Sequence, residues 1–233
     1  IHFGTEKYPD WNAVEAYRTE TYERLIKHQL EADKKSAIAF AREIMANKND
    51  YVILDVEASG LGKNDVITKI GMIDMEGEVL LDTLIKPSQI KEIPANVTKL
   101  TGIDMKMLES APTFKEIYPK FQEITAGKQI LAYNAEFDEK LLCETAKQDD
   151  FNMADPDIHD IADKYAMFRA AWKPSSNNYE TPSLSTADDS LVGYCRGTLA
   201  VIIEMVKPLL VEDADKQLKK RTQHEQHPLS DKI

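Results

Sequence analysis

The feature that most constrains this chain is the run Tyr51–Glu57 (YVILDVE), in which apolar residues are interrupted only by two carboxylates. Such a run is typical of a central strand buried on both faces, which needs a covering layer on each side of its sheet. Asp55 and Glu57 stand two residues apart, so their side chains point to the same face. Two desolvated carboxylates repel each other and need a cation or a proton for compensation. The run therefore predicts an α/β fold with a charged site on its central strand.

Helical and strand patterns alternate around this run. Val66–Asp74 and Glu78–Ile85 are strand-like, and the connection Met75–Gly77 is short enough for an antiparallel hairpin. Trp11–Asn47 is rich in helix formers and has no Gly or Pro, which predicts one or two packing helices. The stretch 174–182 (PSSNNYETP) predicts a loop. Further strands are expected at 129–133 and 158–161, and further helices at 113–125, at 136–146, from 161 through 168, and along 191–206.

Composition limits the classes of function. The chain has 40 Asp and Glu against 29 Lys and Arg, a net charge of −11, which argues against nucleic-acid binding through a broad basic surface but leaves binding through a metal open. No apolar run approaches the roughly 18–20 residues of a membrane span. Residues 1–10 lack the apolar segment of a signal peptide, and only two cysteines occur. We therefore expect a cytoplasmic protein without membrane contact.

A second acidic segment, Asn134–Asp138 (NAEFD), follows the predicted strand at 129–133. An isolated Asp-x-Glu more often marks the end of a buried strand, where polar residues begin again. The surrounding residues therefore decide whether it forms a site. Asp138 falls near a helix start directly after a strand, where side chains converge at a sheet edge. With Asp55 and Glu57 it supplies three hard oxygen donors, which suit Mg²⁺ or Mn²⁺, and nothing resembles a thiolate or histidine zinc site.

These segments resemble motifs of the DEDD 3′–5′ exonuclease superfamily, which includes bacterial proofreading exonucleases and RNase T. Ile53–Leu61 is similar to the first motif and Asn134–Asp138 to the second. The segment between them is matched by Ile93-Pro94, Leu100–Ile103 and Ala111–Phe114. The resemblance covers about 51–146 and implies an RNase H-like mixed five-stranded sheet, with its first three strands antiparallel, flanked by helices. It also implies hydrolysis of phosphodiester bonds from the 3′ end of a single strand.

The resemblance implies roles for individual residues as well. Two divalent cations, Mg²⁺ or Mn²⁺, would be held by Asp55, Glu57 and Asp138, with Asp55 between both ions. Asn134 would orient the strand or the site through hydrogen bonds. The terminal nucleotide would lie against the turn after the first strand, formed by Ala58, Ser59, Gly60 and Leu61. For Leu61, an apolar wedge under the base and plain core packing are equal alternatives.

The late part of the chain departs from the family pattern. The family has a fourth Asp on a late helix, preceded at a fixed spacing by His or Tyr, and neither spacing is present here. One alignment makes Asp189 the fourth ligand, whereas another, anchored on the run 195–202, puts Tyr194 in that position. If Asp189 serves, metal binding survives and turnover is slow, because general-base assistance is missing. If no late acid reaches the site, we expect a degenerate nucleic-acid-binding or protein-interaction module.

Three segments follow from these patterns: an N-terminal helical extension at 1–48, an RNase H-like exonuclease domain at 49–211 and a polar tail at 212–233. The expected partners are a nucleic-acid 3′ end, with DNA favoured over RNA, and a protein or second copy at the N-terminal helices. Few basic residues lie near the motifs, so phosphate contacts should be weak and digestion distributive. A small-molecule α/β enzyme is disfavoured, because no Gly-rich phosphate loop or Ser-His or Cys-His arrangement occurs.

Overall fold

The computed structural model describes residues 11–207, so the tail expected at 212–233 lies outside the described residues. One five-stranded sheet has the order β3-β2-β1-β4-β5. Its strands are β1 Tyr51–Ala58, β2 Ile67–Ile73, β3 Val79–Leu84, β4 Gln129–Ala132 and β5 Ile158–Asp160. β1, β2 and β3 pair antiparallel, whereas β4 and β5 join β1 in parallel. The predicted mixed sheet, with its first three strands antiparallel, is therefore confirmed.

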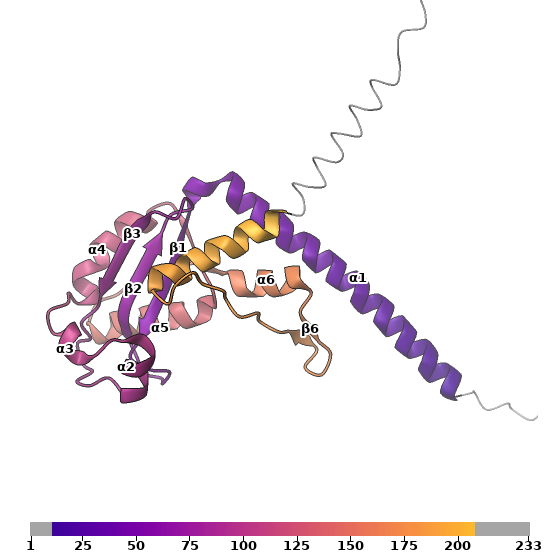
Figure 1. Ribbon diagram of the computed structural model, residues 1–233, viewed down its shortest axis with the longest axis horizontal. Helices are drawn as coiled ribbons and strands as arrows, with labels where there is room; N and C mark the ends of the chain where they lie inside the picture. The colour runs from indigo at the N-terminus through magenta and orange to yellow at the C-terminus, as the bar shows by residue number, and fades with distance from the viewer. Residues whose placement is uncertain (1–10, 208–233) are drawn as a thin grey trace, which may run out of the picture.

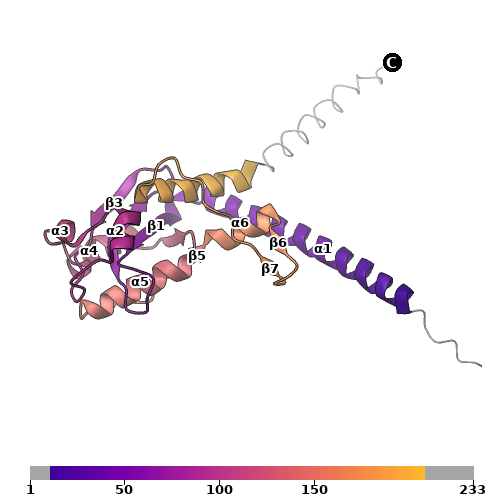
Figure 2. The same cartoon turned by 60° about the horizontal axis from the view of Figure 1, so that its bottom comes forward.

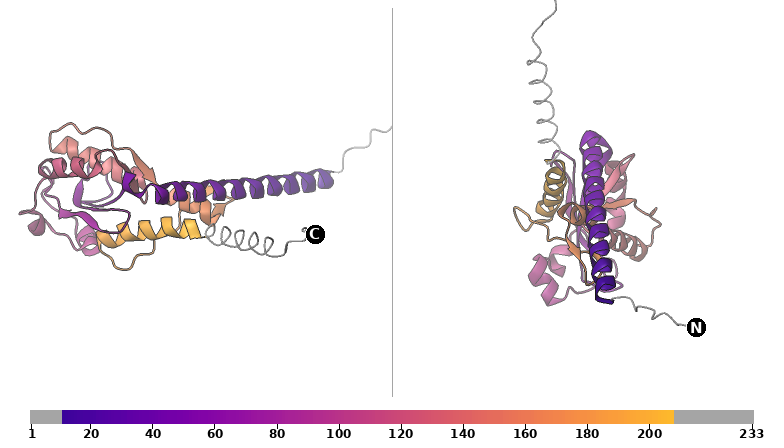
Figure 3. Two further views of the ribbon diagram at one scale, coloured as in Figure 1. Left: turned by 90° about the horizontal axis from the view of Figure 1, so that it is seen from above. Right: turned by 90° about the vertical axis from the view of Figure 1, so that its right-hand side faces the viewer.

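Helices cover both faces of this sheet. They are α1 Trp11–Ala46, the 3₁₀ helix η1 Lys48–Asp50, α2 Ala95–Thr101, α3 Met105–Leu108, α4 Phe114–Thr125, α5 Ala135–Gln148 and α6 Ile161–Arg169. A further helix, the late helix, runs through residues 191–207 of the described chain. Seen from above, α4 and α5 lie on one side of the strands and the late helix on the other (Figure 3).

The alternation of side chains along β1 divides the interior into two cores. Val52, Leu54 and Val56 are buried in a cluster with residues of α4 and α5. Ile53 is buried in a second cluster, with residues of α1, α6 and the late helix. Since both faces of the strand are covered, nearly every position must be apolar. Asp55 shares the face of Ile53 and therefore points toward the side of the late helix.

The N-terminal extension is one continuous helix of 36 residues. In its C-terminal part, Ala37, Ala41 and Ile44 are fully buried in the core. In its N-terminal part, Tyr17 and Leu25 are 69% and 62% exposed. Figures 1 and 2 both show this part of α1 projecting beyond the sheet and its covering helices. The helical extension predicted from the sequence is confirmed, as a single helix.

Two regions carry more regular structure than the sequence predicts. The loop expected at 174–182 belongs to a small hairpin of β6 Trp172–Lys173 and β7 Asn178–Tyr179. The Tyr179 hydroxyl donates to Asp33 Oδ2 of α1 at 2.7 Å, so the hairpin is held against the long helix. The stretch after Pro94 contains α2 and α3. Within residues 11–207, no helix has the length and apolar character to span a bilayer.

Candidate active site

Asp55 and Glu57 lie near the C-terminal end of β1, on the face toward the late helix. In the pairing with β2, Asp55 stands opposite Gly71 and Glu57 opposite Lys69. Burial, with repulsion from Glu57, raises the pKa of Asp55 to about 7. Burial also raises the pKa of Glu57, and the positive charge of Lys69 partly offsets this rise. The folded chain therefore disfavours ionisation of both carboxyls.

Asp138 comes from the first turn of α5 and is only 1% exposed. Within the described part of the chain its Oδ1 has no hydrogen-bond partner. Burial, followed by repulsion from Asp55, raises the pKa of Asp138 well above its ordinary value. Asn134 precedes α5 in the left-handed region, with φ of 75°, and turns the chain sharply from β4 into the helix. The half-buried Asp55 and the buried Asp138 repel each other, and Asp138 Oδ1 has no hydrogen-bond partner in the described part of the chain, so a cation would be stabilised between the two carboxylates.

Asp160, at the end of β5, fixes the start of the helix that carries Asp138. Its Oδ2 accepts from the Ala135 backbone N–H at 3.1 Å, and its Oδ1 accepts from Ala162 N–H at 2.7 Å. One carboxylate thus caps α6 and holds the first turn of α5. The sequence reasoning missed this residue. The sequence feature that could have identified Asp160 is its position directly between a predicted strand and a predicted helix, where an Asp caps the helix.

The turn after β1 is closed by a serine and an aspartate. Ser59 is fully buried, and its Oγ donates to Asp65 Oδ1 at 2.7 Å and accepts from Val66 N–H at 3.0 Å. A Cβ on Gly60 would stand 2.6 Å from Asp65 Oδ2, so a side chain there would displace the Asp65 carboxylate that closes the turn. The Ser59 hydroxyl is therefore used inside the turn. Leu61 is 86% exposed at its tip, which excludes the core-packing alternative for this residue.

The late helix brings a thiol to the face of the carboxylates. Cys195 is fully buried, and its Sγ lies 3.6 Å from the carbonyl oxygen of Gly71, the residue opposite Asp55. Burial, followed by repulsion from Asp55 and Asp138, raises the pKa of this thiol. Asp189 is exposed in the turn that precedes the helix. Its role as the fourth ligand stays a prediction.

The fit of these residues to a divalent cation follows from their chemistry. Among residues 11–207, no group of three or more His, Cys, Asp and Glu side chains is arranged to hold a metal ion. The half-buried Asp55 and the buried Asp138 nevertheless offer hard oxygens whose mutual repulsion a cation would relieve, and Asp138 Oδ1 has no hydrogen-bond partner within residues 11–207. The residues present therefore fit a cation held first by Asp55 and Asp138, with Glu57 next to them on β1.

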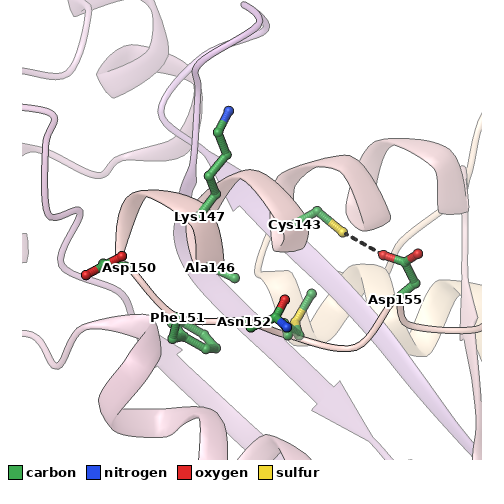
Figure 4. A pocket seen from close by; sticks show the side chains of 8 residues that line it. Cys143, Ala146, Lys147, Asp150, Phe151, Asn152 and Asp155 are labelled. Atoms are coloured by element: carbon green, nitrogen blue, oxygen red, sulfur yellow. Dashed lines mark hydrogen bonds between the residues drawn. The ribbon is translucent and has the colours of Figure 1, made fainter.

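A surface pocket of about 430 Å³ lies on another part of α5 (Figure 4). Its lining includes Cys143 and Lys147 of α5 and, from the following loop, Phe151 and Asp155. Cys143 Sγ lies 3.9 Å from Asp155 Oδ1. None of the predicted site residues lines this pocket, so it is separate from the carboxylates.

Known exonucleases resemble a large part of this chain in sequence. The sequence profile of the RNase T exonuclease family matches residues 52–187. An uncharacterized exonuclease of Escherichia phage 186 is 37% identical over 100 residues, which is 43% of this chain and 50% of the relative. A PolC-type DNA polymerase III of Caldanaerobacter subterraneus is 36% identical over 107 residues, 43% of this chain and 7% of the polymerase. The chain thus spans about half the length of the phage relative.

Solved structures share the fold at low sequence identity. The zinc-bound complex of Escherichia coli exonuclease I with single-stranded DNA aligns with a TM-score of 0.53 and 15% identity, over 75% of this chain and 44% of that protein. A 3′-exonuclease that recognises a histone mRNA stem-loop aligns with a TM-score of 0.53 and 14% identity, over 68% of this chain and 81% of that one. The likeness establishes the exonuclease fold of the sheet and its helices.

Proposed function

The chain belongs to the RNase T exonuclease family, and from this premise we propose that it is a metal-dependent 3′–5′ exonuclease acting on single-stranded nucleic acid. The observation that carries the proposal is the pair Asp55 and Asp138. These carboxyls come from different elements, are desolvated and repel each other, and Asp138 keeps an oxygen without a partner within residues 11–207. Only a bound cation or proton compensates such a pair, and hard oxygen donors select Mg²⁺ or Mn²⁺.

Each residue has a part in the proposed reaction. When bound, divalent cations, two in the mechanism that the family resemblance implies, would supply charge stabilisation at the phosphate and activation of the attacking water. Asp55, Glu57 and Asp138 hold this charge at the end of β1. The exposed Leu61 offers an apolar surface to the terminal base, while Ala58, Ser59 and Gly60 give it a fixed backbone. Asn134, between β4 and α5, orients the strand end.

The residues in and before the late helix determine the turnover rate that we propose. Asp189 is the remaining candidate for the fourth ligand, and the buried face of the helix carries the thiol of Cys195 toward the carboxylates. No residue takes the place of the family's late His or Tyr in the sequence, so we propose slow turnover. The alternative is a degenerate binding module. The phage relative and the solved structures are named as exonucleases, which favours the enzyme.

Substrate, partners and boundaries complete the proposal. DNA is favoured over RNA because a relative is a PolC-type DNA polymerase III; the structural neighbours include both a complex with single-stranded DNA and an exonuclease that recognises an mRNA stem-loop. The projecting part of α1 is available to a protein partner or a second copy. The exonuclease domain is proposed for 49–211, a range that contains the family match at 52–187. A cytoplasmic location stays a prediction.

The proposal is tested with a 5′-labelled DNA single strand, purified protein and Mn²⁺. A ladder of progressively shorter labelled products is expected, because removal from the 3′ end leaves the label on the remaining strand. Asp55→Ala should abolish the ladder, whereas Lys48→Met, at an ion pair with Glu76 away from the site, should leave it unchanged. Immediate release of the label as a mononucleotide would contradict the polarity. The absence of any Mn²⁺-dependent product would contradict the enzyme.

A further inference from the structure

A lysine lies among the carboxylates of the candidate active site. Lys69 stands directly opposite Glu57 in the antiparallel pairing of β1 and β2, so the two side chains share one face. Its Nζ forms an ion pair with Asp82 Oδ1 of β3 at 2.9 Å, and its side chain is 23% exposed. Asp82 in turn pairs with Gly71, which places it on that same face. A positive charge, ion-paired with Asp82, therefore lies on the strand face that carries Glu57.

Among the three carboxylates, Glu57 is the one that Lys69 faces across the strand pair. Its charge lowers the pKa of Glu57 against the effect of burial. The pKa values of Asp55 and Asp138 are instead raised by burial and by neighbouring carboxylates, with only backbone N–H groups acting in the opposite direction. Glu57 thus has a counter-charge from the protein itself. The negative charges of Asp55 and Asp138 depend on a bound cation for compensation.

Within its described residues, the late helix itself turns no oxygen ligand toward the sheet beside Glu57, and Asp189, the candidate that precedes it, is exposed. The buried residue that it turns toward the sheet here is Cys195, whose thiol contacts the carbonyl of Gly71. A protonated, buried thiol is a poor ligand for Mg²⁺ or Mn²⁺, which prefer oxygen. In the part of the chain that the structure describes, no three acidic, thiol or imidazole groups are assembled around an ion position. Of the three carboxylates, Glu57 has Lys69 opposite it on β2, whereas Asp55 and Asp138 repel each other without a lysine opposite them, so the donors favour one cation position over two.

We propose that Lys69 takes the electrostatic place of one divalent cation beside Glu57, so that the free protein binds a single Mg²⁺ or Mn²⁺, at Asp55 and Asp138. The inference rests on the proposed function, because it concerns the same metal centre. Like charges close together in a partly buried site repel strongly, so Lys69 weakens binding of a second cation at Glu57. Binding of a second cation beside Glu57 would then depend on the negative charge that the end of a nucleic acid brings to this face.

The test counts bound ions without using catalysis. Metal-free protein without nucleic acid is titrated with Mn²⁺, and free Mn²⁺ is measured by its electron paramagnetic resonance signal. Wild type should bind one ion. Lys69→Met should bind two, with the dissociation constant of the second at least about tenfold lower than in wild type. Lys69→Arg, which keeps the charge, and Lys48→Met, which removes an ion-paired lysine elsewhere, should each bind one.

A second pair of variants locates the single ion even if Lys69→Met fails to fold. Glu57→Gln should keep one Mn²⁺ per chain, and Asp138→Asn should lose it, with folding checked by circular dichroism. Two Mn²⁺ ions of similar affinity on wild type would overturn the inference and leave the proposed function standing. A folded Lys69→Met that still binds one ion, or loss of the ion in Glu57→Gln, would also overturn it. A wild-type chain that binds no Mn²⁺ would overturn the proposed function as well.

Discussion

Replacing Asp55 by Asn should stabilise the metal-free protein at pH 8 and remove the stabilisation that Mn²⁺ gives to wild type. The pKa of Asp55 is raised to about 7 by burial and by repulsion from Glu57. An ordinary Asp has a pKa of about 3.9, and a tenfold change in an acid dissociation constant corresponds to about 1.4 kcal/mol. The roughly thousandfold weaker acidity of Asp55 thus sets an upper limit of about 4 kcal/mol on the cost of ionising it in the folded chain.

The sign of the pH dependence follows from the raised pKa. Protonated Asp55 contributes its full stability below about pH 4, and this contribution is lost as the pH rises to about 7. Over this window metal-free wild type should lose free energy of unfolding relative to Asp55→Asn, which has no proton to release. Above pH 7 the difference between the two proteins should be constant. A bound Mn²⁺ neutralises the carboxylate and should restore the stability of wild type alone.

The assay is urea unfolding followed by circular dichroism at pH 5 and pH 8, each with EDTA and with Mn²⁺. The exposed Asp157 provides a matched control, since Asp157→Asn removes the same charge outside the site. We expect Asp55→Asn to gain roughly 1–3 kcal/mol over wild type between pH 5 and pH 8 in EDTA. If the free energies of unfolding of Asp55→Asn and wild type differ by the same amount at pH 5 and pH 8 in EDTA, the raised pKa of Asp55 is refuted. Equal stabilisation of both proteins by Mn²⁺ would refute the assignment of Asp55 as a ligand.

Three further predictions concern positioning, substrate contact and the core. Asp160→Ala should lower the free energy of unfolding by about 2 kcal/mol, because it leaves backbone N–H groups of two helices without an acceptor. It should also weaken Mn²⁺ binding more than Asp160→Asn does. Equal Mn²⁺ affinities in the two folded variants would contradict the positioning role of Asp160. Leu61→Ala should leave the melting temperature unchanged and raise KM for a DNA single strand several-fold, and an unaltered KM would remove Leu61 from the substrate surface. Phe114→Ala should lower the free energy of unfolding in urea by about 3–5 kcal/mol, since this ring is fully buried against Phe121 and Phe151, and a loss below about 1 kcal/mol would mean that the site repacks.

Elements with strong local patterns were predictable. The run Tyr51–Glu57 had to be a strand covered on both faces, because no other arrangement buries so many consecutive apolar side chains in a sheet. The spacing of Asp55 and Glu57 fixed their common face through the geometry of a single strand. The short connection at 75–77 led directly to the antiparallel pairing of β2 and β3. Each of these inferences uses residues that are neighbours in the chain.

Short elements were not predictable in the same way. The hairpin of β6 and β7 is only two residues long on each side and lies in a segment of Ser, Asn and Pro. Such a hairpin has little stability of its own, and here a contact between Tyr179 and Asp33 of a distant helix holds it. The helices α2 and α3 are also short and follow an irregular stretch. Their formation depends on the surface on which they pack.

The sequence by itself determined the class of fold, the strand that carries the charge and the chemistry of its carboxylates, because side-chain periodicity within one element is a local property. Only the tertiary structure decided the surroundings of those carboxylates. Lys69 meets Glu57 through strand register, Asp160 reaches Ala135 across two elements, and Cys195 reaches the sheet through helix packing. These contacts join residues far apart in the chain, and they arise from the summed packing of two cores rather than from any motif.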